Sequence, residues 1–506
     1  MERSREAYWT RYPTTSPIKL RWRAQTVRHS FHILPGESIL EIGAGSGLWT
    51  EHLSTVLRGE NPITAAVFDE QFMATHRNIV NARFVTVSDL STDLPQGGFD
   101  YIVGTAILCH NLYGQNLREL YRLLKPGGQL LFFEANYWNP QVALKNMLHS
   151  SGNAKCQVGL RKYKLMQMAS QQGFVDIHVI PYDIVHPLAP RWLISSLQSL
   201  AFMLEHAPAV RELGGTLYIW ARKPGDEQAR RLINLASNPA LYGSTSVVVP
   251  CHNEEMNIPG LIDSLMSCYS PYIHEIIIVN DNSQDRTAAV TREIAAREPR
   301  LKLVDRTPPN GLGRALRDGY AAATGRYILT MDCDFVQIVP EMGDLFDAIG
   351  DSYDGAIGSR FTHESVLINY PFFKILCNRA FHLLANLLLP IRMRDISNNL
   401  KLYRAEILKN LDIEQDHFAA NAETGLKPLL DGYNIKEVPI SWINRTVEMG
   451  RSTFRIVNVA PNYFRALLGM VWKCRFQHRG KRGLRVTSRQ PDFILLPRST
   501  KKDGSA

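Results

Sequence analysis

Two successive series of short apolar stretches, each followed by a turn and a helical stretch, constrain this fold more than any other feature. Alternating strands and helices predict a parallel sheet wound on both faces, with ligands bound beyond the carboxyl ends of the strands. We expect an α/β protein with two doubly wound domains, at 1–224 and 244–458, joined by a linker at 225–243. The expected strands lie at 38–42, 65–69, 83–89, 99–103, 129–134 and 216–223 in the first series, and at 245–250, 275–281 and 326–331 in the second.

Length and composition agree with this division. A chain of 506 residues is too long for one hydrophobic core, and 45% hydrophobic with 21% charged residues is typical of globular proteins. The N-terminus lacks the apolar stretch of a signal peptide. The segment 375–391 is interrupted by polar residues, so we predict an amphipathic helix there rather than a membrane span. The seven cysteines are scattered without a C-x-x-C pair, which favours a cytoplasmic protein without a zinc site.

The positive charge of the chain, +9 net, is concentrated near the C-terminus. Every charged residue from Arg465 to Arg489 is Lys or Arg, and the stretch 463–472 is apolar with Tyr, Phe and Trp. This pattern predicts that 459–506 is a basic amphipathic tail that contacts the inner face of a membrane peripherally. A solvated tail is the first alternative. Nucleic-acid binding is the second, and we expect none because no recognition motif accompanies the charge.

A glycine-rich turn follows the first strand of the chain. Gly43, Gly45 and Gly47 alternate directly after the apolar strand, which lets the backbone turn tightly and approach a ligand. The spacing E-x-G-x-G-x-G differs from the G-x-G-x-x-G of dinucleotide-binding sites. The second strand ends at Asp69, whose carboxylate is suited to a pair of ribose hydroxyls, and the third ends at Asp89.

This first half resembles the class I S-adenosylmethionine-dependent methyltransferases. The resemblance implies that the three glycines line the amino-acid and ribose portion of S-adenosyl-L-methionine and that Glu41 supports the turn. It implies that Asp69 holds the ribose, and Asp89 and Leu90 the adenine. If the methyl acceptor is a hydroxyl, His110 is the candidate base; otherwise it lines the cleft. The acceptor is a small molecule, sugar or lipid, under a cap formed by 138–192.

The second half is organised around Asp332-Cys333-Asp334, which follows the apolar strand 326–331. Carboxylates at positions i and i+2 of an extended strand point to one side, where they can bind a divalent cation that completes its shell with phosphates. Glu254 and Asp281 follow two other strands and should face the same cleft. Acidic side chains gathered in a cleft are costly unless a cation or ligand donors satisfy them.

The ordered motifs of 245–455 resemble the inverting GT-A glycosyltransferases of family 2, most nearly the dolichyl- or polyprenyl-phosphate mannosyltransferase type. They are V-P-x-x-N-E, V-x-D-N-S-x-D-x-T, G-L-G-x-A and D-x-D. The resemblance implies that Asp332 and Asp334 bind Mg²⁺ or Mn²⁺ and act in catalysis. It also implies a GDP- or UDP-sugar donor bound by Pro250, His252, Glu254, Asp281 and Asp332, with His252 where relatives often have Tyr.

The downstream part of the resemblance concerns the acceptor. It implies that a lipid phosphate is held by Arg360, Lys374, Arg445 and Ser452. An ionised phosphate needs no base, whereas a sugar hydroxyl would need one, for which Asp395 or Glu423 is the candidate. Asn398 and Asn399 replace a small glycine pair, which Asn can imitate because it tolerates positive φ.

These inferences predict a bifunctional transferase. One half transfers a sugar from a nucleotide-sugar to a polyprenyl phosphate or related glycolipid, and the other half methylates a separate acceptor. The alternative is a sugar-to-sugar transferase of surface polysaccharide synthesis, with a methyltransferase-like module that is non-catalytic or regulatory.

Overall fold

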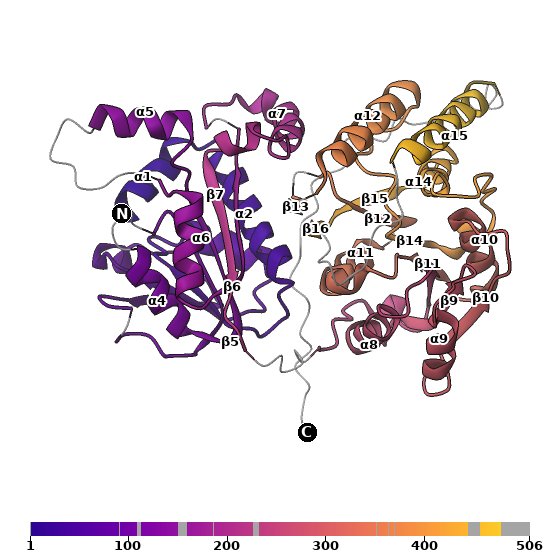
Figure 1. Cartoon of the computed structure of the whole chain (residues 1–506), viewed down its shortest axis with the longest axis horizontal. Helices are drawn as coiled ribbons and strands as arrows, with labels where there is room; N and C mark the ends of the chain where they lie inside the picture. The colour runs from indigo at the N-terminus through magenta and orange to yellow at the C-terminus, as the bar shows by residue number, and fades with distance from the viewer. Residues whose placement is uncertain are drawn as a thin grey trace. The chain divides into compact units, whose positions relative to one another are not determined.

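The computed structural model describes residues 2–90, 92–108, 113–149, 159–185, 187–225, 232–350, 352–362, 364–368, 370–443 and 456–476. The chain forms two compact units, and the second begins at Leu232 (Figure 1). The second half of the expected linker belongs to this second unit. Leu235 is buried, and its N–H donates to the carbonyl of Cys268 at 2.7 Å.

The first unit is built on one seven-stranded sheet in the order β3-β2-β1-β4-β5-β7-β6. The first five of these strands are parallel, whereas β7 runs antiparallel to both of its neighbours. The expected strands are present, and β6 is added from the segment expected to be a cap. The strands are β1 (Ile39–Ile42), β2 (Ile63–Val67), β3 (Ala82–Thr86), β4 (Phe99–Thr105), β5 (Leu124–Ala135), β6 (Val175–Tyr182) and β7 (Thr216–Arg222).

The helices of the first unit bury the apolar strands. Helix α2 packs against α3 and β5, and α4 packs against α6. Because β1 to β4 are parallel, the turns that follow them lie at one edge of the sheet. The helices are α1 (Glu2–Arg11), α2 (Ser16–Phe31), α3 (Leu48–Val56), α4 (Tyr113–Leu123), α5 (Pro140–His149), α6 (Lys162–Gln171) and α7 (Arg191–Leu204), with 3₁₀ turns η1 (Glu70–Ala74) and η2 (Val210–Leu213).

The second unit has its own seven-stranded sheet, in the order β10-β9-β8-β11-β14-β12-β15. Strands β10, β9, β8 and β11 are parallel, and β14 runs antiparallel between β11 and β12. A small parallel pair, β13 and β16, stands apart. The strands are β8 (Thr245–Cys251), β9 (Ile273–Asn280), β10 (Leu301–Asp305), β11 (Tyr327–Thr330), β12 (Gly355–Ser359), β13 (Val366–Ile368), β14 (Lys401–Arg404), β15 (Ile435–Pro439) and β16 (Ser441–Ile443).

The orientation of β14 determines which segments meet. Its first residue, Lys401, pairs with the last residue of β11, Thr330, and also with Ile357 near the end of β12. The segment that precedes β14 therefore reaches the edge at which β8, β9, β11 and β12 end.

The helices of the second unit include the predicted amphipathic helix and the start of the predicted basic tail. The predicted amphipathic helix is α12 (Phe372–Leu388). The expected tail begins within α15 (Ile456–Phe476), which packs against α12 and α14 and buries Leu467 and Met470 in the core. The other helices are α8 (Ile258–Tyr269), α9 (Thr287–Ala295), α10 (Leu312–Ala322), α11 (Gly343–Ala348), α13 (Ala405–Lys409) and α14 (Ala420–Leu430), with η3 (Pro239–Leu241) and η4 (Phe335–Met342).

Candidate active sites

The glycine-rich turn of the first unit has the backbone that its sequence predicts. Gly43, Gly45 and Gly47 have φ of +70°, +58° and +83°, values that L-residues with a side chain rarely adopt. A Cβ atom added to Gly45 would lie 2.5 Å from Oε1 of Glu6. Glu41 is buried behind this turn, and burial raises its pKa to about 7. The turn thus leaves its backbone accessible to a close neighbour.

In the structure that close neighbour is helix α1. The carboxylate of Glu6 accepts hydrogen bonds from the N–H and the hydroxyl of Ser46, at 3.2 and 2.9 Å. Glu2 accepts from the N–H of Asp69 at 2.8 Å, and Arg3 forms an ion pair with the Asp69 carboxylate. This arrangement could not be predicted from the sequence, because the first residues are polar and carry no motif.

The other predicted cofactor residues lie at the same edge of the sheet. Asp89 and Leu90 follow β3, and Leu90 packs against the core. Sequence reasoning missed Glu134 at the end of β5, which accepts from the N–H groups of Ile107 and Leu108 at 2.7 and 2.9 Å. Burial raises the pKa of Glu134 to about 7. His110 lies outside the described residues.

In the second unit, Asp281 follows β9, is buried, and bonds to several neighbouring segments. Its N–H donates to the carbonyl of Cys251 at 2.8 Å, and one carboxylate oxygen accepts from the N–H of Gly311 at 2.7 Å. The other carboxylate oxygen forms an ion pair with Arg306. The peptide carbonyl of Asp281 lies 2.9 Å from Nδ1 of His252.

Glu254 and Pro250 lie at the neighbouring strand, β8. Pro250 is within β8, and Glu254 follows three residues after the strand ends. The Glu254 N–H donates to the hydroxyl of Thr287 at 2.9 Å, and its carboxylate accepts from the side-chain amide of Asn257 at 2.6 Å. Because β8 and β9 are parallel neighbours, Pro250, Glu254 and Asp281 lie at the same edge of the sheet.

Asp332 and Asp334 lie beyond the strand rather than on it. Strand β11 ends at Thr330, and the two acids occupy a turn that leads into η4. The expected extended geometry is therefore absent, since Asp334 has φ of −83° and ψ of 4°. Between them, a hydrogen bond with Cys251 and burial raise the pKa of Cys333 well above its ordinary value. The thiol thus stays protonated and is a poor metal ligand.

Asn399 holds the first of these acids. Its side-chain amide donates to Oδ1 of Asp332 at 2.7 Å, and that of Asn398 donates to the Gly358 carbonyl at 2.7 Å. Neither asparagine has positive φ, so the expectation that they imitate a glycine backbone was wrong. They act through their side-chain amides, and Asn399 fixes the position of Asp332.

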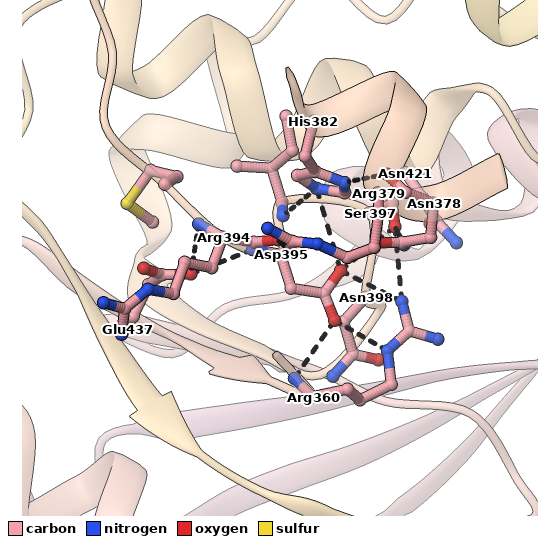
Figure 2. Close-up of polar contacts among 12 residues, drawn as sticks. Arg360, Asn378, Arg379, His382, Arg394, Asp395, Ser397, Asn398, Asn421 and Glu437 are labelled. Carbon is pink, nitrogen blue, oxygen red and sulfur yellow. Dashed lines mark hydrogen bonds and ion pairs between the residues drawn. The ribbon is translucent and has the colours of Figure 1, made fainter. Parts of the chain in front are cut away.

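Asp395, four residues before Asn399, forms a bidentate ion pair with Arg360 (Figure 2). Nε and Nη2 of Arg360 donate to the two carboxylate oxygens at 2.6 and 3.0 Å, and the Arg360 N–H adds a third bond at 3.1 Å. Burial alone would raise the pKa of Asp395, but the charge and hydrogen bonds of Arg360 lower it below its ordinary value. A carboxylate this acidic and enclosed is a poor general base.

The Asp395 loop is held by α12 and by β15. His382 accepts from the N–H of Ile396 at 2.8 Å through Nε2, and its Nδ1 donates to the Asn378 carbonyl at 2.7 Å (Figure 2). Burial lowers the pKa of His382 to about 4, so the ring is neutral. Glu437 accepts from the N–H of Asp395 at 2.9 Å.

The other residues predicted on the acceptor side are Lys374, Glu423, Arg445 and Ser452. Burial, and then the charge of Arg360, lower the pKa of Lys374. Glu423 is buried, accepts from the N–H of Gln415 at 2.8 Å and pairs with Lys427 at 2.7 Å. This structural arrangement disfavours a role as base. Arg445 and Ser452 lie outside the described residues.

The predicted metal ligands are Asp332 and Asp334. Within the described ranges, no group of three or more His, Cys, Asp and Glu side chains is placed to hold a metal ion. Asp332 and Asp334 supply carboxylate oxygens alone, the donor type that Mg²⁺ and Mn²⁺ prefer. Such a pair suits a cation whose remaining ligands come from substrate phosphates and water.

Both units match known families. Residues 18–179 match the family model of a methyltransferase domain, and residues 246–412 match that of glycosyl transferase family 2. A curated relative, polyprenol monophosphomannose synthase of Mycolicibacterium smegmatis, is 29% identical over 44% of this chain and 84% of its own length. Dolichyl-phosphate hexose transferase of Haloferax volcanii is 28% identical over 41% of this chain and 86% of its own length.

A third relative and two solved structures are also similar. Dolichol-phosphate mannosyltransferase of Pyrococcus furiosus is 28% identical over 39% of this chain and 56% of its own length. A SAM-dependent methyltransferase of Thermotoga maritima is 16% identical, with a TM-score of 0.32 over 44% of this chain and 97% of that chain. Glucosyl-3-phosphoglycerate synthase of Mycobacterium tuberculosis is 18% identical, with a TM-score of 0.38 over 45% of this chain and 80% of that chain.

Proposed function

We propose that this transferase, which joins a methyltransferase domain to a family 2 glycosyltransferase domain, transfers a hexose from a nucleotide-sugar to a polyprenyl phosphate. The observation that carries the proposal is the loop from Asp395 to Asn399. At one end it binds Arg360, and at the other it binds Asp332. One short loop thereby binds both a cation suited to an acceptor phosphate and the acid predicted to serve the donor diphosphate. The names of the curated relatives support the same acceptor class.

The proposed reaction is an in-line displacement at the anomeric carbon. An oxygen of the lipid phosphate forms a bond to that carbon, while the bond to the nucleoside diphosphate breaks with its electron pair and the configuration inverts. A Mg²⁺ or Mn²⁺ ion held by Asp332 and Asp334 would stabilise the negative charge of the departing diphosphate. Arg360 and Lys374 would hold the acceptor phosphate, because guanidinium and ammonium groups bind phosphate oxygens.

A sugar hydroxyl is the alternative acceptor, and the geometry disfavours it. That reaction needs a base, and both candidates, Asp395 and Glu423, are buried and engaged in ion pairs. An ionised phosphate needs none. The residues of the site therefore fit a phosphate nucleophile better.

The test is transfer of labelled sugar from GDP- and UDP-sugars onto a polyprenyl phosphate, with Mg²⁺ or Mn²⁺. We expect label in the lipid phase with the native chain, and at least a ~100-fold loss with Asp332→Asn, which removes one metal ligand charge. Asp263→Asn, an exposed acid on α8, is the matched control. Donor hydrolysis without lipid labelling would contradict the acceptor and move the proposal to a glycan hydroxyl.

For the first unit we propose S-adenosyl-L-methionine as cofactor, bound at the glycine-rich turn. The positive φ values of Gly43, Gly45 and Gly47 support close approach of a ligand to this backbone. When bound, the cofactor supplies an activated methyl group, and the protein's task is to align the acceptor with it. Binding of S-adenosylhomocysteine, measured by calorimetry with Gly45→Val as the non-binding variant, tests this. Failure of the native chain to bind would favour a docking module.

A further inference from the structure

Helix α12 turns polar side chains toward the protein and apolar side chains toward the outside, the opposite of an ordinary surface helix. Its polar side chains point into the protein: Asn378 donates to the Ser397 hydroxyl at 3.0 Å, and Arg379 to the Arg394 carbonyl at 3.0 Å. Asn386, although exposed, also bonds back to the protein and donates to the Met393 carbonyl at 2.9 Å. A surface helix normally turns its polar face outward.

The outward face of α12 is apolar. Phe373, Leu383 and Leu387 have exposed fractions of 70%, 66% and 76%. Leu376 and Leu384 are also exposed, and α12 contains no acidic residue. Exposed apolar side chains that recur along one helix face mark an interaction surface, whereas single ones do not.

The neighbouring helix α15 carries a second apolar stripe. It lies beside α12 (Figure 1), and the rings of Phe381 and Tyr463 are in contact, with centroids 5.4 Å apart. Phe464, Leu468 and Trp472, spaced four residues apart and therefore on one helix face, are exposed by 48%, 46% and 56%. We call the exposed apolar residues of these two helices the apolar band: Phe373, Leu376, Leu383, Leu384, Leu387, Phe464, Leu468 and Trp472.

The charged residues of α12 and α15 themselves have a single sign, although Lys473 pairs with Glu414 of a neighbouring segment and Arg379 points inward. Every ionisable Asp, Glu, Lys or Arg of α12 and α15 is basic: Lys374, Arg379, Arg465, Lys473 and Arg475. Arg465 is exposed next to Phe464. No helix among the described residues is long and apolar enough to cross a membrane. A wide apolar face with Trp and Phe, flanked by cations, matches the interface of an anionic bilayer.

We propose that α12 and α15 dock on the surface of an anionic phospholipid bilayer, with the apolar band at the boundary between headgroups and acyl chains. The purpose of this docking rests on the proposed function, since the polar face of α12 holds the loop of Asp395 and thereby Arg360. One helix then connects the membrane to the cations for the acceptor phosphate. The docking itself needs no substrate.

The test is flotation of the full chain with vesicles of phosphatidylcholine and phosphatidylglycerol that contain no polyprenyl phosphate. We expect the native chain to float, and the double variant Leu383→Gln, Leu387→Gln to bind at least about tenfold more weakly, because two large side chains no longer favour burial. Met256→Gln, which alters an equally exposed apolar residue elsewhere in the unit, should bind as the native chain does. Vesicles of phosphatidylcholine alone should bind less.

Two outcomes would overturn the docking: no flotation of the native chain, or equal flotation of the double variant. A dimer in light scattering that the double variant dissociates would assign the apolar band to a second copy instead. Transfer to a short, water-soluble isoprenyl phosphate without vesicles separates the two proposals. The double variant should keep native turnover there, whereas flotation without any transfer would leave the docking intact and contradict the proposed function.

Discussion

Asp395 is a charged carboxylate in the interior of the second unit. It is completely buried, and its charge is compensated by one guanidinium, that of Arg360. Removing one partner of a buried ion pair leaves the other charge without compensation. The observed contacts of Asp395 fix the guanidinium of Arg360. Sequence reasoning, which considered Asp395 as a base, had no means of detecting that Arg360 would reach it.

Substitution of Asp395 tests this positioning. We expect Asp395→Asn to lower the free energy of unfolding by roughly 3–5 kcal/mol, because Arg360, whose side chain is only 12% exposed, loses its counter-charge. Urea denaturation of both forms measures the difference, with Asp263→Asn as the exposed control. A loss no larger than that of the control would contradict the buried pair.

His382 makes stability depend on pH. Its pKa is about 4 in the folded chain, below the ordinary 6.5, because burial disfavours the charged ring. Between these values the unfolded chain binds a proton that the folded chain excludes, so stability falls as pH decreases from 6.5 to 4, by roughly 3 kcal/mol in total. Asp395, Arg360 and Arg379 are the charges around the ring.

The measurement is the urea midpoint from pH 7 to 4 for the native chain and for His382→Gln. The variant should be less stable at pH 7 and should lose less stability on acidification. His274→Gln, at an exposed position, should keep the native slope. An unchanged slope in His382→Gln would show that other groups cause the pH dependence.

At the scale of elements, side chains of α1 bind the same groups that we propose for the cofactor. Arg3 is paired with Asp69, and Glu6 with Ser46. Both contacts are partly exposed, and such pairs contribute about 0–1 kcal/mol each. We expect the double variant Arg3→Ala, Glu6→Ala to bind S-adenosylhomocysteine roughly two- to tenfold more tightly, as measured by calorimetry.

The opposite result has an equally definite meaning. Weaker binding by the double variant would show that α1 supplies contacts to the cofactor instead of competing with it. Arg11→Ala, at the exposed end of α1, is the control, since it preserves the helix and the two contacts.

The strands of both sheets could be predicted because each is an apolar run bounded by turn residues. Local pattern could not predict the contacts that complete the second site. Asn399 reaches Asp332 across 67 residues, and only the antiparallel insertion of β14 brings them together. The turn at Asp332 was mistaken for strand because Met331 extends the apolar run beyond the last paired residue. Helix α1 was missed because no apolar periodicity marks it.

At the scale of the whole molecule, the two compact units contain separate cores and separate sites. We expect their functions to be lost independently. Gly45→Val should abolish S-adenosylhomocysteine binding, since a branched side chain is strained at φ +58° and meets Glu6, while glycosyl transfer continues. Asp332→Asn should show the converse. Loss of both functions in either variant would indicate that the units are coupled.

The antiparallel insertion of β14 also limits the number of residues that the segment before it, 395–401, can contain. Successive residues of a strand face opposite sides, so one inserted residue before Lys401 would either turn β14 over or move Asn399 away from Asp332. Asp395 is fixed to Arg360 at the other end of the same short loop. Insertions and deletions should therefore be tolerated in surface loops long before they are tolerated in this buried segment between 395 and 401. This spacing is a sharper criterion for sequences that share this site than overall identity.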